Sequence, residues 1–137
     1  METGDIILDT IQLDNGLIVY FIDRSRPIAG DRWQVRLLIR VPLEPGETFF
    51  ARYPDPPSAC ADFASLCPTA EFEVEKVRNF IDAGQREAVL EQLKKDFVQS
   101  ALGYLANPGF AEGWITRKYE ELRRERATRD AYEQALR

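Results

Sequence analysis

The sequence contains no histidine among its 137 residues. Without an imidazole, the chain cannot form a Ser-His-Asp or Cys-His catalytic arrangement, use a histidine general base, or bind zinc or iron through histidine. Catalysis would have to rely on carboxylates, Lys, Arg, Tyr, Ser or Cys, and no cofactor fingerprint accompanies these residues. We therefore expect a protein that is not an enzyme and that binds neither a metal nor a cofactor.

Cysteine is scarce, with only Cys60 and Cys67 in the chain. Structural zinc sites place paired cysteines closer together and need further ligands, which are missing here. A disulfide or redox pair is the alternative, but two reduced thiols are the usual state of cysteines in a cytoplasmic protein. We expect reduced thiols.

Long hydrophobic runs are also missing. The longest, from Leu17 to Ile22, has six residues and is far too short to cross a bilayer. The acidic first residues, Met1 to Asp5, lack the basic start and apolar stretch of a signal peptide. These absences predict a soluble, cytoplasmic protein without membrane association.

Lysine is rare, since 14 of the 18 basic residues are arginine. An arginine excess suits bidentate recognition of anions, but codon bias in a GC-rich genome explains it equally simply, and we favour that explanation. The net charge of −5 argues against a general nucleic-acid binder, which would usually be basic. The charge is unevenly divided: residues 1–116 carry 11 Lys and Arg against 18 Asp and Glu, whereas residues 117–137 carry seven against five.

The sequence has what a globular domain needs. Its length fits one domain spanning residues 1–137, and its 45% apolar and 11% aromatic content is typical of a folded chain. Residues 6–13 and 17–23 are rich in β-branched and apolar side chains, with Asn15-Gly16 between them. This pattern predicts a β-hairpin closed by a type I′ turn.

A third strand is predicted over residues 32–42, where apolar and polar residues alternate with the period of two that marks a half-buried antiparallel strand. Pro27 and Gly30 make residues 24–31 an irregular connection. After a long irregular segment at residues 43–70, with a short helix at 58–66 capped by Ser58, residues 71–81 predict a fourth strand with a bulge after Glu75. A helix is the competing interpretation of that last segment.

Two helices are predicted to complete the chain. The first has apolar residues at three- and four-residue steps, namely Val89, Leu90, Leu93, Phe97, Ala101, Leu102 and Leu105. Asn107 is the predicted cap of the second, with Pro108 at its first position. The second helix buries Phe110, Trp114, Ile115, Tyr119 and Leu122. Beyond Leu122 the apolar stripe ends, so residues 123–137 should project into solvent, contact a partner or fray.

The predicted fold class is α+β: an antiparallel β-meander of about four strands, with the two C-terminal helices packed on one face as an αα-hairpin. Within it, the connection before the third strand offers Arg24, Arg26, Asp31 and Arg32 as candidates for binding a carboxylate or phosphate. The alternative is an ordinary solvated loop whose charges pair with one another.

The outer face of the third strand carries a second candidate, the row Arg32, Arg36 and Arg40. Residues four apart on one face lie roughly 13 Å from each other, which suits a series of anionic groups. Cross-strand carboxylates such as Asp9 or Glu73 would instead neutralise the row. No aromatic side chains are interleaved on this face for base stacking, so nucleic acid is not an expected partner.

Three functions remain open at this point. The first is a non-enzymatic protein-interaction module, expected to be a homodimer or to bind another protein, through a sheet edge or the terminal helix. The second is a regulatory domain that binds a small molecule or anion through the arginines named above. The third is an enzyme based on the carboxylates Glu71, Glu73 and Glu75 or on the cysteines, for which the sequence offers no further support. We favour them in that order.

Overall fold

The computed structural model describes residues 5–137, and their contacts divide the chain into two compact units. The first unit combines the described residues up to Pro42 with Glu71–Pro108, and the second combines Leu43–Ala70 with Gly109–Arg137. The prediction of one domain over residues 1–137 stays a prediction.

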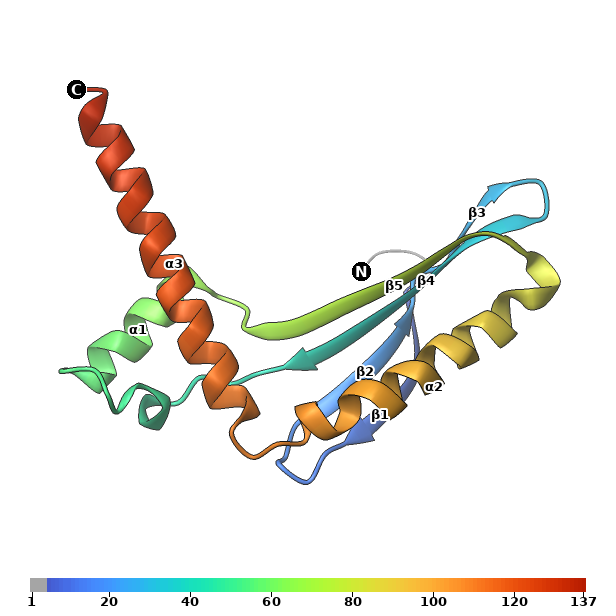
Figure 1. The fold of residues 1–137 in the computed structure, drawn as a ribbon, viewed down its shortest axis with the longest axis horizontal. Coiled ribbons are helices and arrows are strands. Elements are labelled where there is room, and N and C mark those ends of the chain that lie inside the picture. Colours follow the sequence, from blue (N-terminus) through green and yellow to red (C-terminus); the bar gives the residue numbers. More distant parts are fainter. Residues whose placement is uncertain (1–4) are drawn as a thin grey trace. The chain divides into compact units, whose positions relative to one another are not determined.

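The first unit is built on a five-stranded antiparallel sheet. Its strands are β1 (Ile6–Gln12), β2 (Ile18–Asp23), β3 (Arg26–Ala29), β4 (Arg32–Pro42) and β5 (Glu71–Asp82). β4 organises the sheet, because β5 pairs along its whole length while β2 and β3 each pair with a different part of it (Figure 1). The α+β class and the predicted bounds of β4 are confirmed.

The β1–β2 hairpin is confirmed, but its turn differs from the predicted type I′. Gly16 has φ +88°, whereas Asn15 does not have a positive φ. The amide of Gly16 donates to the Leu13 carbonyl (3.0 Å) and the amide of Leu13 to the Leu17 carbonyl (2.8 Å), which defines a three-residue loop with a left-handed glycine. Asn15 instead donates from its side chain to the carbonyls of Leu105 and Asn107, which ties the loop to the C-terminal end of α2 (Arg86–Leu105).

β3 lies where the sequence predicted an irregular connection. A proline normally argues against a strand, but β3 is a short edge strand in which the missing amide is tolerated. Gly30, with φ +58°, makes the tight return into β4. The five-stranded sheet therefore contains one strand more than predicted.

β5 is a strand and not the competing helix, and it does contain a bulge. The bulge was predicted after Glu75, but the register with β4 shifts between Arg78 and Ile81. Phe80 lies in this shift with φ +59°, the single positive φ of a residue other than glycine in the described chain.

Helix α2 (Arg86–Leu105) follows a short 3-10 turn, η2 (Ala83–Gln85), and packs against β4 and β5 (Figure 1). It buries the apolar stripe expected from the sequence through Leu90, Leu93 and Phe97. The rings of Phe97 and Phe21 meet edge to face with centroids 6.2 Å apart. β4 contributes four fully buried side chains to this core: Val35, Leu37, Ile39 and Val41.

The second unit consists of η1 (Glu47–Phe50), α1 (Pro56–Leu66) and α3 (Phe110–Ala135). α1 begins earlier than predicted, because Asp55 and not Ser58 is the cap: its carboxylate accepts from the Ser58 amide at 3.2 Å. α3 begins later than predicted, after Gly109 and not Asn107, with no side-chain cap. None of the described helices is long and apolar enough to cross a membrane.

An aromatic cluster forms the centre of the second unit. Phe50 of η1 and Phe63 of α1 are fully buried, and Tyr119 of α3 packs edge-on against both at centroid distances of 5.5 and 6.0 Å. Tyr53 completes the cluster at 5.3 Å from Tyr119. The sequence prediction placed both C-terminal helices on the sheet; α2 packs there, and α3 packs against η1 and α1.

Candidate functional site

The arginine row of β4 is paired with carboxylates of β5. Arg36 binds both oxygens of Glu75 through one guanidinium nitrogen, at 2.9 and 3.1 Å. Arg32 donates to Asp82, whose position lies directly opposite in the strand pair. The predicted alternative, that cross-strand carboxylates neutralise this row, therefore describes the pairs well.

Arg40 completes the row between two carboxylates. Its guanidinium lies 3.4 Å from Glu71 and 3.2 Å from Glu73. Burial and a hydrogen bond to Glu73 raise the pKa of Glu71 above its ordinary value, although Arg40 opposes this shift. Asp9, the other carboxylate considered for the row, pairs with Lys94 of α2 at 2.6 Å instead. The row is thus a ladder of internal ion pairs.

The arginines of the β2–β3 segment differ from one another. Arg24 lies 3.2 Å from Asp5, and Asp31 lies 3.9 Å from Arg32. Arg26 has an amide as its partner: its Nε donates to Gln34 at 3.0 Å, and it forms no ion pair with any residue from 5 to 137. The structure therefore distributes the predicted binding residues along the sheet and distinguishes Arg26 from the others.

Arg26 borders a shallow hollow of about 430 Å³ in the first unit. The hollow is lined by residues of β3, β4 and β5, namely Arg26, Pro27, Ile28, Gln34, Asn79 and Phe80. Asn79 and Phe80 come from the bulge of β5, which the sequence did not place there. Of the residues that line the hollow, only Arg26 was predicted from the sequence as a binding residue.

A polar network anchors α3 to α1 in the second unit. Arg126 donates to both oxygens of Asp62, at 2.8 and 3.0 Å, and the Tyr119 hydroxyl donates to the same carboxylate at 2.8 Å. Arg126, more than Tyr119, lowers the pKa of Asp62. Burial, with a further contribution from Asp62, raises the pKa of Tyr119 to about 12.

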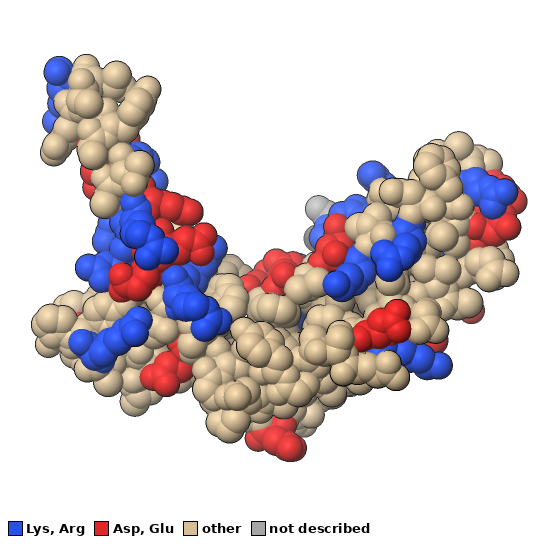
Figure 2. All heavy atoms as spheres, in the orientation of Figure 1, with Lys and Arg blue, Asp and Glu red and all other residues tan. Residues whose placement is uncertain are grey.

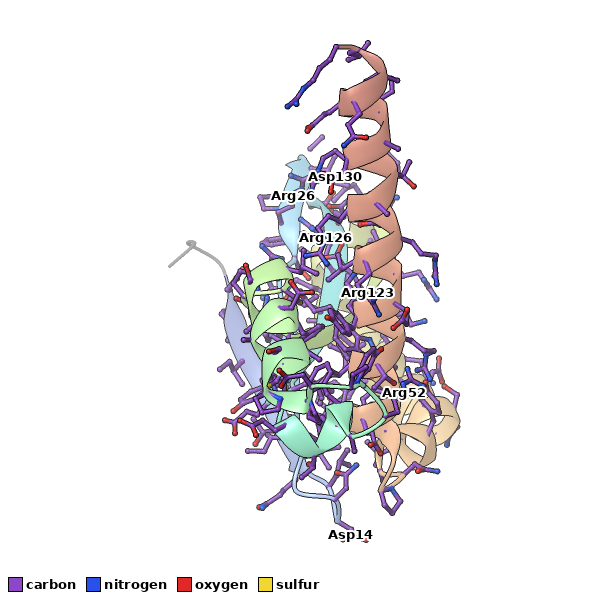
Figure 3. The ribbon with its side chains drawn as sticks, turned by 90° about the vertical axis from the view of Figure 1, so that its left-hand side faces the viewer. Asp14, Arg26, Arg52, Arg123, Arg126 and Asp130 are labelled. Atoms are coloured by element: carbon purple, nitrogen blue, oxygen red, sulfur yellow. The ribbon has the colours of Figure 1, made fainter. Side chains whose placement is uncertain are left out.

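Arg123 extends this network one turn earlier on α3, on the side that faces α1 (Figure 3). Its guanidinium lies over the rings of Tyr53 and Tyr119, at 5.7 and 5.3 Å from their centroids, and within 3.1 Å of Glu120. The Tyr53 hydroxyl donates to Glu120 and lowers the pKa of that carboxyl, with Arg123 contributing further. The hydrogen bonds Tyr119–Asp62 and Tyr53–Glu120 join residues that lie 57 and 67 positions apart in the sequence, so sequence reasoning missed them.

Every residue of α3 after Arg126 is exposed. The helix nevertheless continues to Ala135, and its end extends past α1 (Figure 1). The sequence predicted that residues 123–137 would project or fray. The anchored part reaches further than that, because Arg123 and Arg126 contact Tyr53, Tyr119 and Asp62.

The remaining chemistry of the chain is sparse. Cys60 and Cys67 are free thiols, and no group of three metal-binding side chains occurs within residues 5–137. Among the open surfaces of the described residues are the hollow at Arg26 and the end of α3. No protein-family model matches the chain significantly, and the same holds for curated proteins and for solved structures.

Proposed function

We propose that the protein is a non-enzymatic interaction module that presents the C-terminal end of α3, residues 127–135, to another protein. The supporting observation is that this stretch remains helical although all of its side chains are exposed. Short helices in water are marginal, and most helical stability in proteins comes from packing one face against something. A partner would supply that packing.

The anchor just before this stretch adds to the argument. Arg126 is fixed to Asp62 by two hydrogen bonds, and Tyr119 is buried in the aromatic cluster. A rigidly held helix loses less conformational entropy when a partner binds its free end than a disordered tail would. The arrangement therefore suits recognition through a preformed helix.

A second copy of the chain is the partner we propose first. Acidic and basic side chains alternate over α3, and Figure 2 shows both signs side by side on its surface. Such a mixed surface is compatible with pairing to itself, because each copy offers both charges to the other. Tyr132 and Leu136, which are 66% and 70% exposed, would supply the apolar contacts.

The outer edge of β1 is a second candidate surface for a homodimer. β1 ends the sheet next to β2, and it exposes Ile6 by 58%, Ile7 by 60% and Leu8 by 43%. Edge strands of monomeric proteins are usually protected by charged residues or proline, as β5 and β3 are here. β1 carries a single charge, Asp9, and that charge is paired with Lys94.

Native mass spectrometry of the full chain and of a chain ending at Arg126 tests the proposal. We expect the full chain to form dimers and the shortened chain to be monomeric. The aromatic circular-dichroism signal should differ only by the contribution of Tyr132, because the anchor is kept. The shortened chain should lose only the helical signal of the missing turns. Dimers that persist in the shortened chain, or a full chain that stays monomeric at high concentration, would contradict a homodimer formed through α3.

A further inference from the structure

We propose that the hollow at Arg26 is a binding site for a carboxylate carried on an apolar group. This site is independent of the function proposed for α3, because all of its residues belong to the first unit. The proposal combines three properties of the hollow: a chain of hydrogen bonds that leaves donors unused, an arginine without an acidic partner among residues 5–137, and apolar walls.

The hydrogen bonds follow one direction across the three strands. Arg26 donates from Nε to Gln34 Oε1, and Gln34 donates from Nε2 to Asn79 Oδ1 at 2.9 Å. Each side-chain oxygen of the two amides is thereby engaged by a neighbour. Within the described part of the chain, the groups left over are donors: the two terminal nitrogens of the Arg26 guanidinium and the Asn79 Nδ2. A group that accepts several hydrogen bonds complements this set.

The charge of Arg26 favours an anionic acceptor. The other arginines predicted as ligands have carboxylates within 4 Å, and Arg26 has none among the described residues. The two terminal nitrogens of a guanidinium match the two oxygens of a carboxylate, and such charge-assisted pairs are stronger than neutral hydrogen bonds. A ligand carboxylate would give Arg26 the partner that β5 gives to Arg32 and Arg36.

The walls of the hollow favour an apolar group beside that carboxylate. Pro27 and Ile28 line it from β3, and Ile28 is 42% exposed. Phe80 lines it from β5 and is 69% exposed, whereas Phe21, Phe50 and Phe63 are fully buried. Covering these side chains would remove apolar surface from water, which stabilises a complex.

Phe80 gives further support through its backbone. A bulky side chain with φ +59° is a conformational outlier, and such residues tend to occur where a side chain is redirected for a function. Bulges commonly redirect side chains near binding sites. Here the bulge brings Asn79 and Phe80 to the same hollow, one as a donor and the other as an apolar wall.

A titration followed by ¹⁵N NMR tests the site with defined probes. The free acids are 3-phenylpropionate and N-acetyl-Gly-Phe with a free C-terminus, and the matched controls are the amides of both compounds. We expect both acids to shift the amide signals of residues 26, 28–34 and 79–80, and the uncharged amides to bind at least about tenfold more weakly. Tighter binding of the peptide would identify a protein C-terminus as the source of the carboxylate; tighter binding of the small acid would identify a metabolite.

Two variants complete the experiment. Arg26→Gln should weaken binding of the acids by about tenfold, because it removes the charge and keeps an amide donor. Arg32→Gln is the matched control, since Arg32 is already paired with Asp82, and it should leave binding unchanged. Equal binding of acids and amides, absent binding of all four probes, or full binding by Arg26→Gln would overturn the proposal. The comparison of acids with amides uses the unmodified protein and does not depend on how a variant folds.

Discussion

Phe80 shows how a single residue can combine local strain with a surface role. Its left-handed backbone costs an L-residue about 1–2 kcal/mol, and its exposed ring recovers little by burial. Alanine at this position would keep the backbone strain, whereas glycine would remove it. We expect Phe80→Gly to unfold with a free energy roughly 0.5–1 kcal/mol above that of Phe80→Ala, after glycine's greater freedom in the unfolded chain is subtracted.

Urea denaturation of the two Phe80 variants measures this difference. Alanine and glycine remove nearly the same side chain, so the comparison isolates the backbone. An alanine variant more stable than the glycine variant by about 0.5–1 kcal/mol, which is the entropic cost of glycine alone, would show that the position carries no strain.

Tyr119 makes a prediction about alkaline pH. The pKa of its hydroxyl is raised to about 12 in the folded protein, against 10.0 for the unperturbed group. Between these two values the unfolded chain loses the proton while the folded chain keeps it, so Tyr119 stabilises the fold below pH 10 and this contribution falls as the pH rises further. Tyr119→Phe should therefore lose less stability than the unmodified protein between pH 10 and 12.

The free energy of unfolding, followed from pH 9 to 12 in both proteins, checks this expectation. At neutral pH the Tyr119→Phe variant should be less stable by about 1 kcal/mol, because the hydrogen bond to Asp62 is lost. The other tyrosines titrate in both proteins and cancel in the comparison. Parallel curves above pH 10 would contradict the raised pKa.

At the scale of elements, β1 is the strand most open to pairing with another chain. Ile7 of β1 lies opposite Ile22 of β2, and its side chain is 60% exposed. A lysine there would place a charge beside any added strand, which is how natural edge strands prevent association. Ile7→Lys should lower self-association if β1 contributes to a dimer, with little effect on stability because the side chain is already exposed.

Gln12→Lys is the matched control for this substitution. Gln12 is exposed at the far end of the same strand, and replacing it with lysine introduces the same charge. Sedimentation velocity at several protein concentrations would compare the two variants. Equal self-association of both variants would exclude the N-terminal end of β1, around Ile7, from the interface and leave the end of α3 as the surface to examine.

The elements that could be predicted from the sequence are those whose own residues show the pattern of apolar and polar side chains that defines them. The alternation from Arg32 to Pro42 defines β4, because in a half-buried strand the apolar side chains face the core and the polar ones face solvent. β3 was missed because Pro27 and Gly30 are typical of loops, and only its pairing with β4 makes it a strand. The helix starts were misplaced because Asp55 and Gly109 compete with equally plausible caps a few residues away.

The candidate site could be predicted only in part, for a reason that belongs to the whole molecule. Arginine content and spacing identified the residues, but the carboxylates that pair with the β4 arginines come from β5, which lies 31 to 50 residues later in the chain. Which arginine keeps an unused charge depends on strand register, and the bulge at Phe80 decides that register locally. A sequence pattern contains no information about that choice.

The division into two units leads to a prediction for the whole chain. Each unit contains one of the two tryptophans, Trp33 in the first and Trp114 in the second, so Trp114→Phe and Trp33→Phe give proteins whose fluorescence reports one unit at a time. The second unit buries fewer large apolar side chains than the first, and its core depends on the cluster around Phe50. We expect the Trp114 signal to change at a lower urea concentration than the Trp33 signal.

Coincident transitions would mean that the chain unfolds as one cooperative domain, as its length suggested. Separate transitions would mean that the sheet with α2 and the unit that contains α3 are distinct folding units. Phe63→Ala sharpens this choice, because it opens a cavity in the second unit and should cost about 3–5 kcal/mol there. With separate units, Phe63→Ala shifts the Trp114 transition and leaves the Trp33 transition in place; with one cooperative domain, it shifts both together.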